Sequence, residues 1–105
     1  MTNKDFQNLL EEVITHTRNV LGHKAGEYAR GDDRLSNFKI AAALNQSTPE
    51  KALLGMLSKH IVSVWDLVAD IDREVVASMP LWEEKIGDVI NYMILLKALI
   101  VERID

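Results

Sequence analysis

The chain has 105 residues, of which 48% are hydrophobic and 27% are charged, and its formal net charge is −4. This length predicts a single domain, residues 1–105, and the composition is typical of a soluble globular protein. The negative charge argues against general nucleic-acid binding. No uninterrupted apolar run is long enough for a membrane span, the first residues lack the apolar segment of a signal peptide, and cysteine is absent. We therefore expect a cytoplasmic protein with no membrane partner.

Apolar residues spaced three and four apart predict four helices, over 4–21, 34–44, 49–75 and 81–102. Asp33 is a suitable N-cap for the second of them. The third can begin with Thr48 as its N-cap and Pro49 at its first helical position. A capping box of Ser47 and Glu50 would fit the same start. No strand-like alternation is present, so the sequence predicts an all-α, bundle-like domain.

The fourth predicted helix has more apolar residues than one core-facing stripe requires. They are Ile86, Val89, Ile90, Met93, Ile94, Leu96, Leu99, Ile100 and Val101. A surface helix normally buries one face only, so a second buried face is expected. We therefore predict a homo-oligomer, either a dimer or a tetramer.

The same helix also carries a polar stripe within this apolar surrounding. Glu84, Asp88 and Asn91 stand at i, i+4 and i+7, which places them along one face. A buried carboxylate is costly unless it is paired or bound to a metal. We therefore expect a specific partner for Asp88.

A second polar stripe is predicted on the third helix and comprises Lys59, Ser63, Asp66 and Asp70. If the two helices pack antiparallel, the stripes can face each other. Asp66, Glu84 and Asp88 would then form an acidic cluster suited to Mg²⁺ or Mn²⁺. Such an ion polarises a phosphoryl oxygen and activates water. Lys59 and His60 would be placed to contact phosphate.

Each of these residues also has a purely structural interpretation. Asp66 and Asp70 can face water, and Glu84 can pair with a neighbouring cation. Asp88 and Asn91 can be internal hydrogen-bond partners that fix the register of the helices.

A second candidate site lies at the corner between the first two predicted helices. Lys24 and Glu27 are three residues apart and share a helix face. Tyr28 or Phe38 could stack on a nucleobase, and Asn37 could bind its edge. Alternatively, Phe38 anchors the second helix in the core.

Both polar segments resemble motifs of a known group of small helical proteins from phages and bacteria, the nucleotide-modification-associated domain type. The signature "EK-x-x-D-x-x-NY" of that group is matched by Glu84, Lys85, Asp88, Asn91 and Tyr92. Its upstream motif is matched by Lys24, Glu27, Tyr28, Asn37 and Phe38. The resemblance covers about residues 10–102.

That group is similar to the all-α nucleoside triphosphate pyrophosphatases of the MazG and dUTPase type. These enzymes hold Mg²⁺ with acids from two adjacent helices and cleave between the α- and β-phosphates. The resemblance implies a MazG-like fold, a nucleotide ligand and a metal site formed by Asp66, Glu84 and Asp88, with Glu27 as a further candidate. These three acids would also be the catalytic residues.

The resemblance further implies phosphate contacts from Lys24, Lys59 and His60, and sugar or base contacts from Asn37, Asn91 and Tyr92. It also implies a phage or prophage origin, hence residence in the host cytoplasm. The chain departs from the related enzymes at Ser63 and Asp66, where they have two glutamates. The alternative is a non-catalytic helical binding or regulatory module that self-associates.

Overall fold

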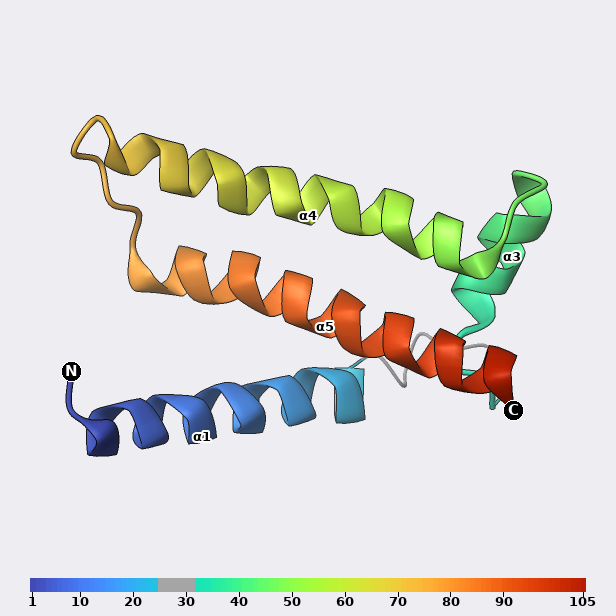
Figure 1. The fold of residues 1–105 in the computed structure, drawn as a ribbon, viewed down its shortest axis with the longest axis horizontal. Coiled ribbons are helices and arrows are strands. Elements are labelled where there is room, and N and C mark those ends of the chain that lie inside the picture. The colour runs from blue at the N-terminus through green and yellow to red at the C-terminus, as the bar shows by residue number, and fades with distance from the viewer. Residues whose placement is uncertain (25–31) are drawn as a thin grey trace. The chain divides into compact units, whose positions relative to one another are not determined.

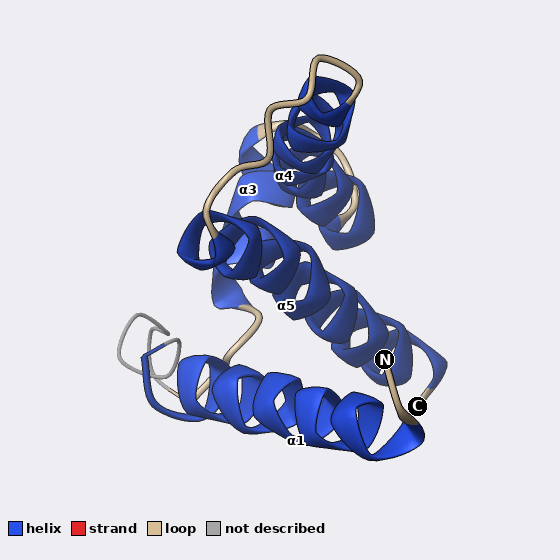
Figure 2. Cartoon of the chain, turned by 90° about the vertical axis from the view of Figure 1, so that its left-hand side faces the viewer, coloured by secondary structure: helices blue, strands red, loops and turns tan. Residues whose placement is uncertain are grey.

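The structure is a computed structural model that describes residues 1–24 and 32–105, without the side chains of residues 23 and 24. The chain divides into two compact units, Met1–Arg34 and Leu35–Asp105. In the described ranges every regular element is a helix (Figure 2). The prediction of an all-α protein is therefore confirmed.

The first unit is built around helix α1, Asn3–Asn19, which continues into a π-helical turn, η1, at Val20–Lys24. A capping box starts α1: the Asp5 backbone N–H donates to the Thr2 hydroxyl, and the Thr2 backbone N–H donates to the Asp5 carboxylate. This box satisfies two amides that the first turn of a helix leaves without partners. The helix starts within one residue of the predicted position.

The second unit contains three helices: α3, Ser36–Leu44; α4, Pro49–Ile71; and α5, Met79–Ile104. Helices α4 and α5 pack side by side and run in opposite directions, and α3 packs across the end where α4 begins (Figure 1). The short connection between α4 and α5 favours this antiparallel arrangement.

The helix ends agree with the sequence signals in part. Thr48 is the N-cap of α4, because its hydroxyl accepts from the Lys51 amide at 3.2 Å, and Pro49 follows it. The prediction of Asp33 as the N-cap of α3 is wrong: that position is Leu35, and it makes no side-chain cap. Helix α4 ends earlier than expected, and the turn after it includes Glu74 with a φ of 61°.

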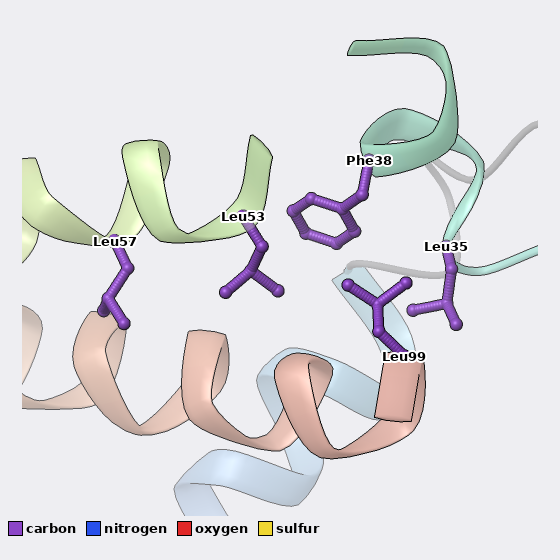
Figure 3. Packing of buried hydrophobic residues seen from close by; sticks show 5 residues of the cluster. All are labelled: Leu35, Phe38, Leu53, Leu57 and Leu99. Carbon is purple, nitrogen blue, oxygen red and sulfur yellow. The ribbon is translucent and has the colours of Figure 1, made fainter. Parts of the chain in front are cut away.

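The core of the second unit lies where its three helices meet. Leu35 and Phe38 enter from the start of α3, Leu53 and Leu57 from α4, and Leu99 from α5, and their side chains point toward one another (Figure 3). Partly buried apolar side chains surround them, namely Met56, Val89, Tyr92, Leu95, Leu96 and Ala98. Burial of this cluster is the main contribution that holds the three helices together.

Two ion pairs join the end of α5 to the neighbouring helices. The Arg103 guanidinium donates two hydrogen bonds to the Glu50 carboxylate, at 2.6 and 2.7 Å. The Lys39 ammonium of α3 donates to Glu102 at 2.5 Å. The bidentate pair with Arg103 lowers the pKa of Glu50 from its ordinary value of 4.5, chiefly through the hydrogen bonds, and the same contact raises the pKa of Arg103.

We expect the contribution of the Glu50–Arg103 pair to stability to depend on pH. Because the pKa of Glu50 is lowered in the folded state, its contribution is fully present above the unfolded pKa and is lost as the pH falls through the folded pKa. In thermal melts, the Tm of the wild type should therefore be higher than that of Arg103→Gln at pH 7. The difference between the two Tm values should decrease as the pH is lowered. An equal difference in Tm at pH 7 and in acid would contradict this assignment. The matched control is Arg73→Gln, which breaks only a local pair with Asp70.

Within the described ranges, α4 is the helix that is long and apolar enough to cross a membrane, judged by length and composition alone. In this structure it packs against α3 and α5, and only 11% of its most apolar window is buried. Helix α4 therefore has much apolar surface that the other helices of the second unit, α3 and α5, leave uncovered.

Candidate functional site

The candidate site lies between α4 and α5 and is centred on His60 and Asp88. Leu53, Leu57 and His60 stand at i, i+4 and i+7, so α4 presents all three on the side that packs against its neighbours. His60 Nδ1 lies 3.3 Å from Asp88 Oδ2, and the two side chains are 29% and 33% exposed. Asp88 thus has the specific partner that its apolar surroundings lead one to expect.

Tyr92 extends this pair on the same side of α5, four residues after Asp88. Its ring lies 4.9 Å from the His60 ring, centroid to centroid, with an interplanar angle of 30°. Tyr92 also meets the core residue Phe38 edge to face, at 6.4 Å and 70°. The imidazole is therefore held by a carboxylate on one side and by a ring that is itself packed on the core.

Asn91 contributes a polar atom that the described residues leave unpaired. Its amide oxygen Oδ1 is buried and accepts no hydrogen bond within these parts of the chain. A buried polar atom without a partner costs roughly 1–3 kcal/mol. Asn91 follows Asp88 by three residues, so the unpaired acceptor lies on the same side of α5 as the carboxylate.

The other acids of the two predicted polar stripes, of which Asp66 and Glu84 were assigned to the metal site, have different surroundings. Asp66 is exposed on α4, and Asp70 accepts from Arg73 three residues later. Glu84 is exposed, and its Oε1 lies 3.9 Å from the Nζ of Lys85. Across residues 1–24 and 32–105, no group of three or more histidine or acidic side chains is placed to hold a metal ion. The expected cluster of three acids does not form within these ranges.

Helical geometry explains why His60 reaches α5 while the neighbouring polar stripe does not. Successive residues of an α-helix are rotated by about 100°, so Lys59 lies well away from the direction of His60. Lys59 and Asp66 are exposed, and the Ser63 hydroxyl donates to the Lys59 carbonyl at 3.1 Å within the same helix. Lys59 and Asp66 of the stripe thus face solvent, whereas His60 beside them contacts α5.

The structure describes only some of the residues of the second candidate site, at the corner between the first two predicted helices. Asn37 is exposed on the first turn of α3, while Phe38 beside it points into the core. Glu27 and Tyr28 lie outside the described residues, and Lys24 ends η1 with its side chain outside the description. Sequence reasoning did not foresee the contact between Tyr92 and His60, although the i, i+4 spacing of Asp88 and Tyr92 was its signal.

Chemically, the site is an imidazole–carboxylate pair beside an aromatic ring and a free amide oxygen. Such a pair fixes the orientation of the imidazole and leaves its second nitrogen, Nε2, to bind a ligand or move a proton. Comparison with protein-family models, with curated proteins and with solved structures finds no match. The functional argument therefore rests on the residues themselves.

Proposed function

We propose that this chain is a nucleotide-binding protein whose ligand occupies the patch formed by His60, Asp88, Asn91 and Tyr92, called here the His60–Asp88 patch. The observation that carries the proposal is the 3.3 Å contact between His60 Nδ1 and Asp88 Oδ2, two side chains that are 29% and 33% exposed between two helices. Residues that only fix a helix interface are more often apolar, since a polar or charged group costs desolvation energy on burial. A role in binding accounts for this arrangement.

The chemistry of the patch suits the two parts of a nucleotide. A protonated imidazole binds phosphate oxygens through charge-assisted hydrogen bonds, and the long side chain of Lys59, on the adjoining exposed face of α4, can reach the outer phosphates. The buried, unpaired Oδ1 of Asn91 is an acceptor that the edge of a base or the hydroxyls of a sugar can satisfy once ligand binding opens the patch. The rings of His60 and Tyr92 add an aromatic surface of the kind that nucleobases contact.

Magnesium or manganese remains part of this proposal only in a reduced form. A site of three protein carboxylates does not fit the described residues. Mg²⁺ in nucleotide sites is, however, often held by one or two carboxylates together with substrate phosphates. Asp88, with Glu84 one turn earlier on α5, would supply those carboxylates, and we assign no reaction step to the ion.

Thermal melts test the proposal directly. With a panel of nucleoside mono-, di- and triphosphates, each with and without Mg²⁺ or Mn²⁺, we expect at least one nucleotide to raise the Tm. A ligand at 100 times its Kd adds about 2.7 kcal/mol to stability, which corresponds to roughly 10–20 °C for a small domain. Asp88→Asn should remove most of this shift.

The matched control for this test is Glu83→Gln, which changes an exposed acid on the same helix. It should keep the full ligand-induced shift. The proposal fails if no nucleotide stabilises the protein, or if Asp88→Asn responds as strongly as wild type. A pyrophosphate-release assay on the nucleotide that binds then separates hydrolysis from binding alone.

A second candidate function is that of a non-catalytic module that self-associates. One observation favours it: in the described ranges, large apolar side chains are exposed along α1, α4 and α5, while six hydrophobic residues are buried. In this case the His60–Asp88 contact serves only to set the register of α4 on α5. No nucleotide would then raise the Tm. The effect of Asp88→Asn would be confined to a change in the Tm of the ligand-free protein.

A further inference from the structure

Helix α4 carries a second apolar stripe that lies outside the core of the second unit. Its large members are Leu54, Ile61, Trp65 and Val68, at i, i+7, i+11 and i+14. The Trp65 side chain is 74% exposed, and the other three are about half exposed. With Ser58 between Leu54 and Ile61, the spacing alternates between four and three residues. This is the repeat of helices that pair along their length.

The two ends of this stripe carry opposite charges. Continuing the same spacing leads to Lys51 at the beginning of α4 and to Asp72 directly after its end. Both side chains are exposed, and neither forms an ion pair with another residue in the described parts of the chain. The stripe is therefore positive at one end and negative at the other.

The side chains along the stripe also differ in size. The small residue Ser58 lies in the first half, with Gly55 beside the stripe and Leu54 as the large apolar residue of that half, whereas Trp65 and Val68 fill the second half. A Cβ at Gly55 would meet nothing within 4 Å among the described residues, so no contact within the second unit requires a glycine, which costs about 1 kcal/mol relative to alanine within a helix. The Ser58 hydroxyl donates to the Gly55 carbonyl at 2.7 Å and can be buried while satisfied.

We propose that this stripe is a homodimer interface, in which α4 pairs antiparallel with α4 of a second copy about a two-fold axis near Ile61 and Val62. Lys51 then lies opposite Asp72 of the second copy, and the small Ser58 of each stripe lies opposite the large Trp65 of the other. A parallel pair would bring like charges and large side chains together. A self-complementary patch of this kind is what a two-fold dimer requires.

This interface does not depend on nucleotide binding. His60 lies on the side of α4 that faces α5, whereas the stripe lies outside the core, so both surfaces can function at once. The other surface that could cover the stripe is a lipid bilayer, given the length and apolar composition of α4. The exposed Lys59 and Asp66, and the packing of α4 on α5, favour a protein partner.

Sedimentation of the full-length protein tests which face is used. We expect wild type to be dimeric at micromolar concentration and Trp65→Asp to raise the dimer Kd at least tenfold, with unchanged helix content. Met93→Asp changes an exposed apolar residue on α5 and should leave the dimer intact. The proposal is overturned if wild type is monomeric, or if Met93→Asp dissociates the dimer while Trp65→Asp does not.

Disulfide trapping tests the antiparallel register on an unaltered apolar stripe, because the chain has no cysteine. Positions 51 and 72 of one helix are separated by about 30 Å. Under oxidation, Lys51→Cys and Asp72→Cys should each form no disulfide-linked dimer when alone, and a mixture of the two variants should form a mixed disulfide dimer. The proposal is refuted if either single variant crosslinks with itself or if the mixture forms no mixed dimer. It is also refuted if phosphatidylcholine–phosphatidylglycerol vesicles remove the wild type from solution.

Discussion

Leu53→Ala is expected to lower the free energy of unfolding by about 2–5 kcal/mol. Leu53 is the fully buried side chain among the described residues, with 0% exposure, and it contacts the core where all three helices of the second unit meet (Figure 3). A domain of this size has a total stability of about 5–15 kcal/mol. Urea unfolding followed by circular dichroism should therefore show a clearly lower midpoint.

Leu44→Ala is the matched control for this prediction, because Leu44 is 79% exposed at the end of α3. It should change the free energy of unfolding by no more than about 0.5 kcal/mol. Equal effects of the two substitutions would mean that the cluster around Leu53 is not the core of this unit.

Phe38→Ala should have an effect of similar size, about 3–5 kcal/mol. The Phe38 ring is 6% exposed and meets both the leucine cluster and the edge of Tyr92. Its removal leaves a cavity and also removes the support of the ring that packs on His60. We therefore expect lower stability in urea, together with a weaker near-ultraviolet signal from Tyr92.

The two phenylalanines of the chain allow a direct comparison for this prediction. Phe6 on α1 is 53% exposed, so Phe6→Ala should cost less than about 1 kcal/mol. The opposite ranking would contradict the placement of Phe38 in the core.

The helices could be predicted from the sequence because their signals are local. Apolar spacing located all of the described helices, and Thr48 with Pro49 marked the start of α4 correctly. Asp33 failed as a cap because α3 begins two residues later than its capping signal implies, after Leu35, which makes no side-chain cap. The end of α4 was placed too late, since an apolar pattern does not show where the backbone turns.

The candidate site could be predicted only in part. The apolar surroundings of Asp88 correctly indicated a specific partner, but its identity depends on how α4 is rotated against α5. If α4 were rotated about its axis by one residue, about 100°, Lys59 would face α5 in place of His60. Leucines at 53 and 57 decide this rotation, and their burial is known only once the helices are packed.

The proposed site is tested most directly by a nuclear magnetic resonance titration with the nucleotide that stabilises the protein. We expect the ring resonances of His60 and Tyr92 to shift and saturate together, while those of His16 on α1 stay unchanged. Saturable shifts confined to other residues, or no shift at any nucleotide concentration, would contradict the assignment of this patch as the ligand site.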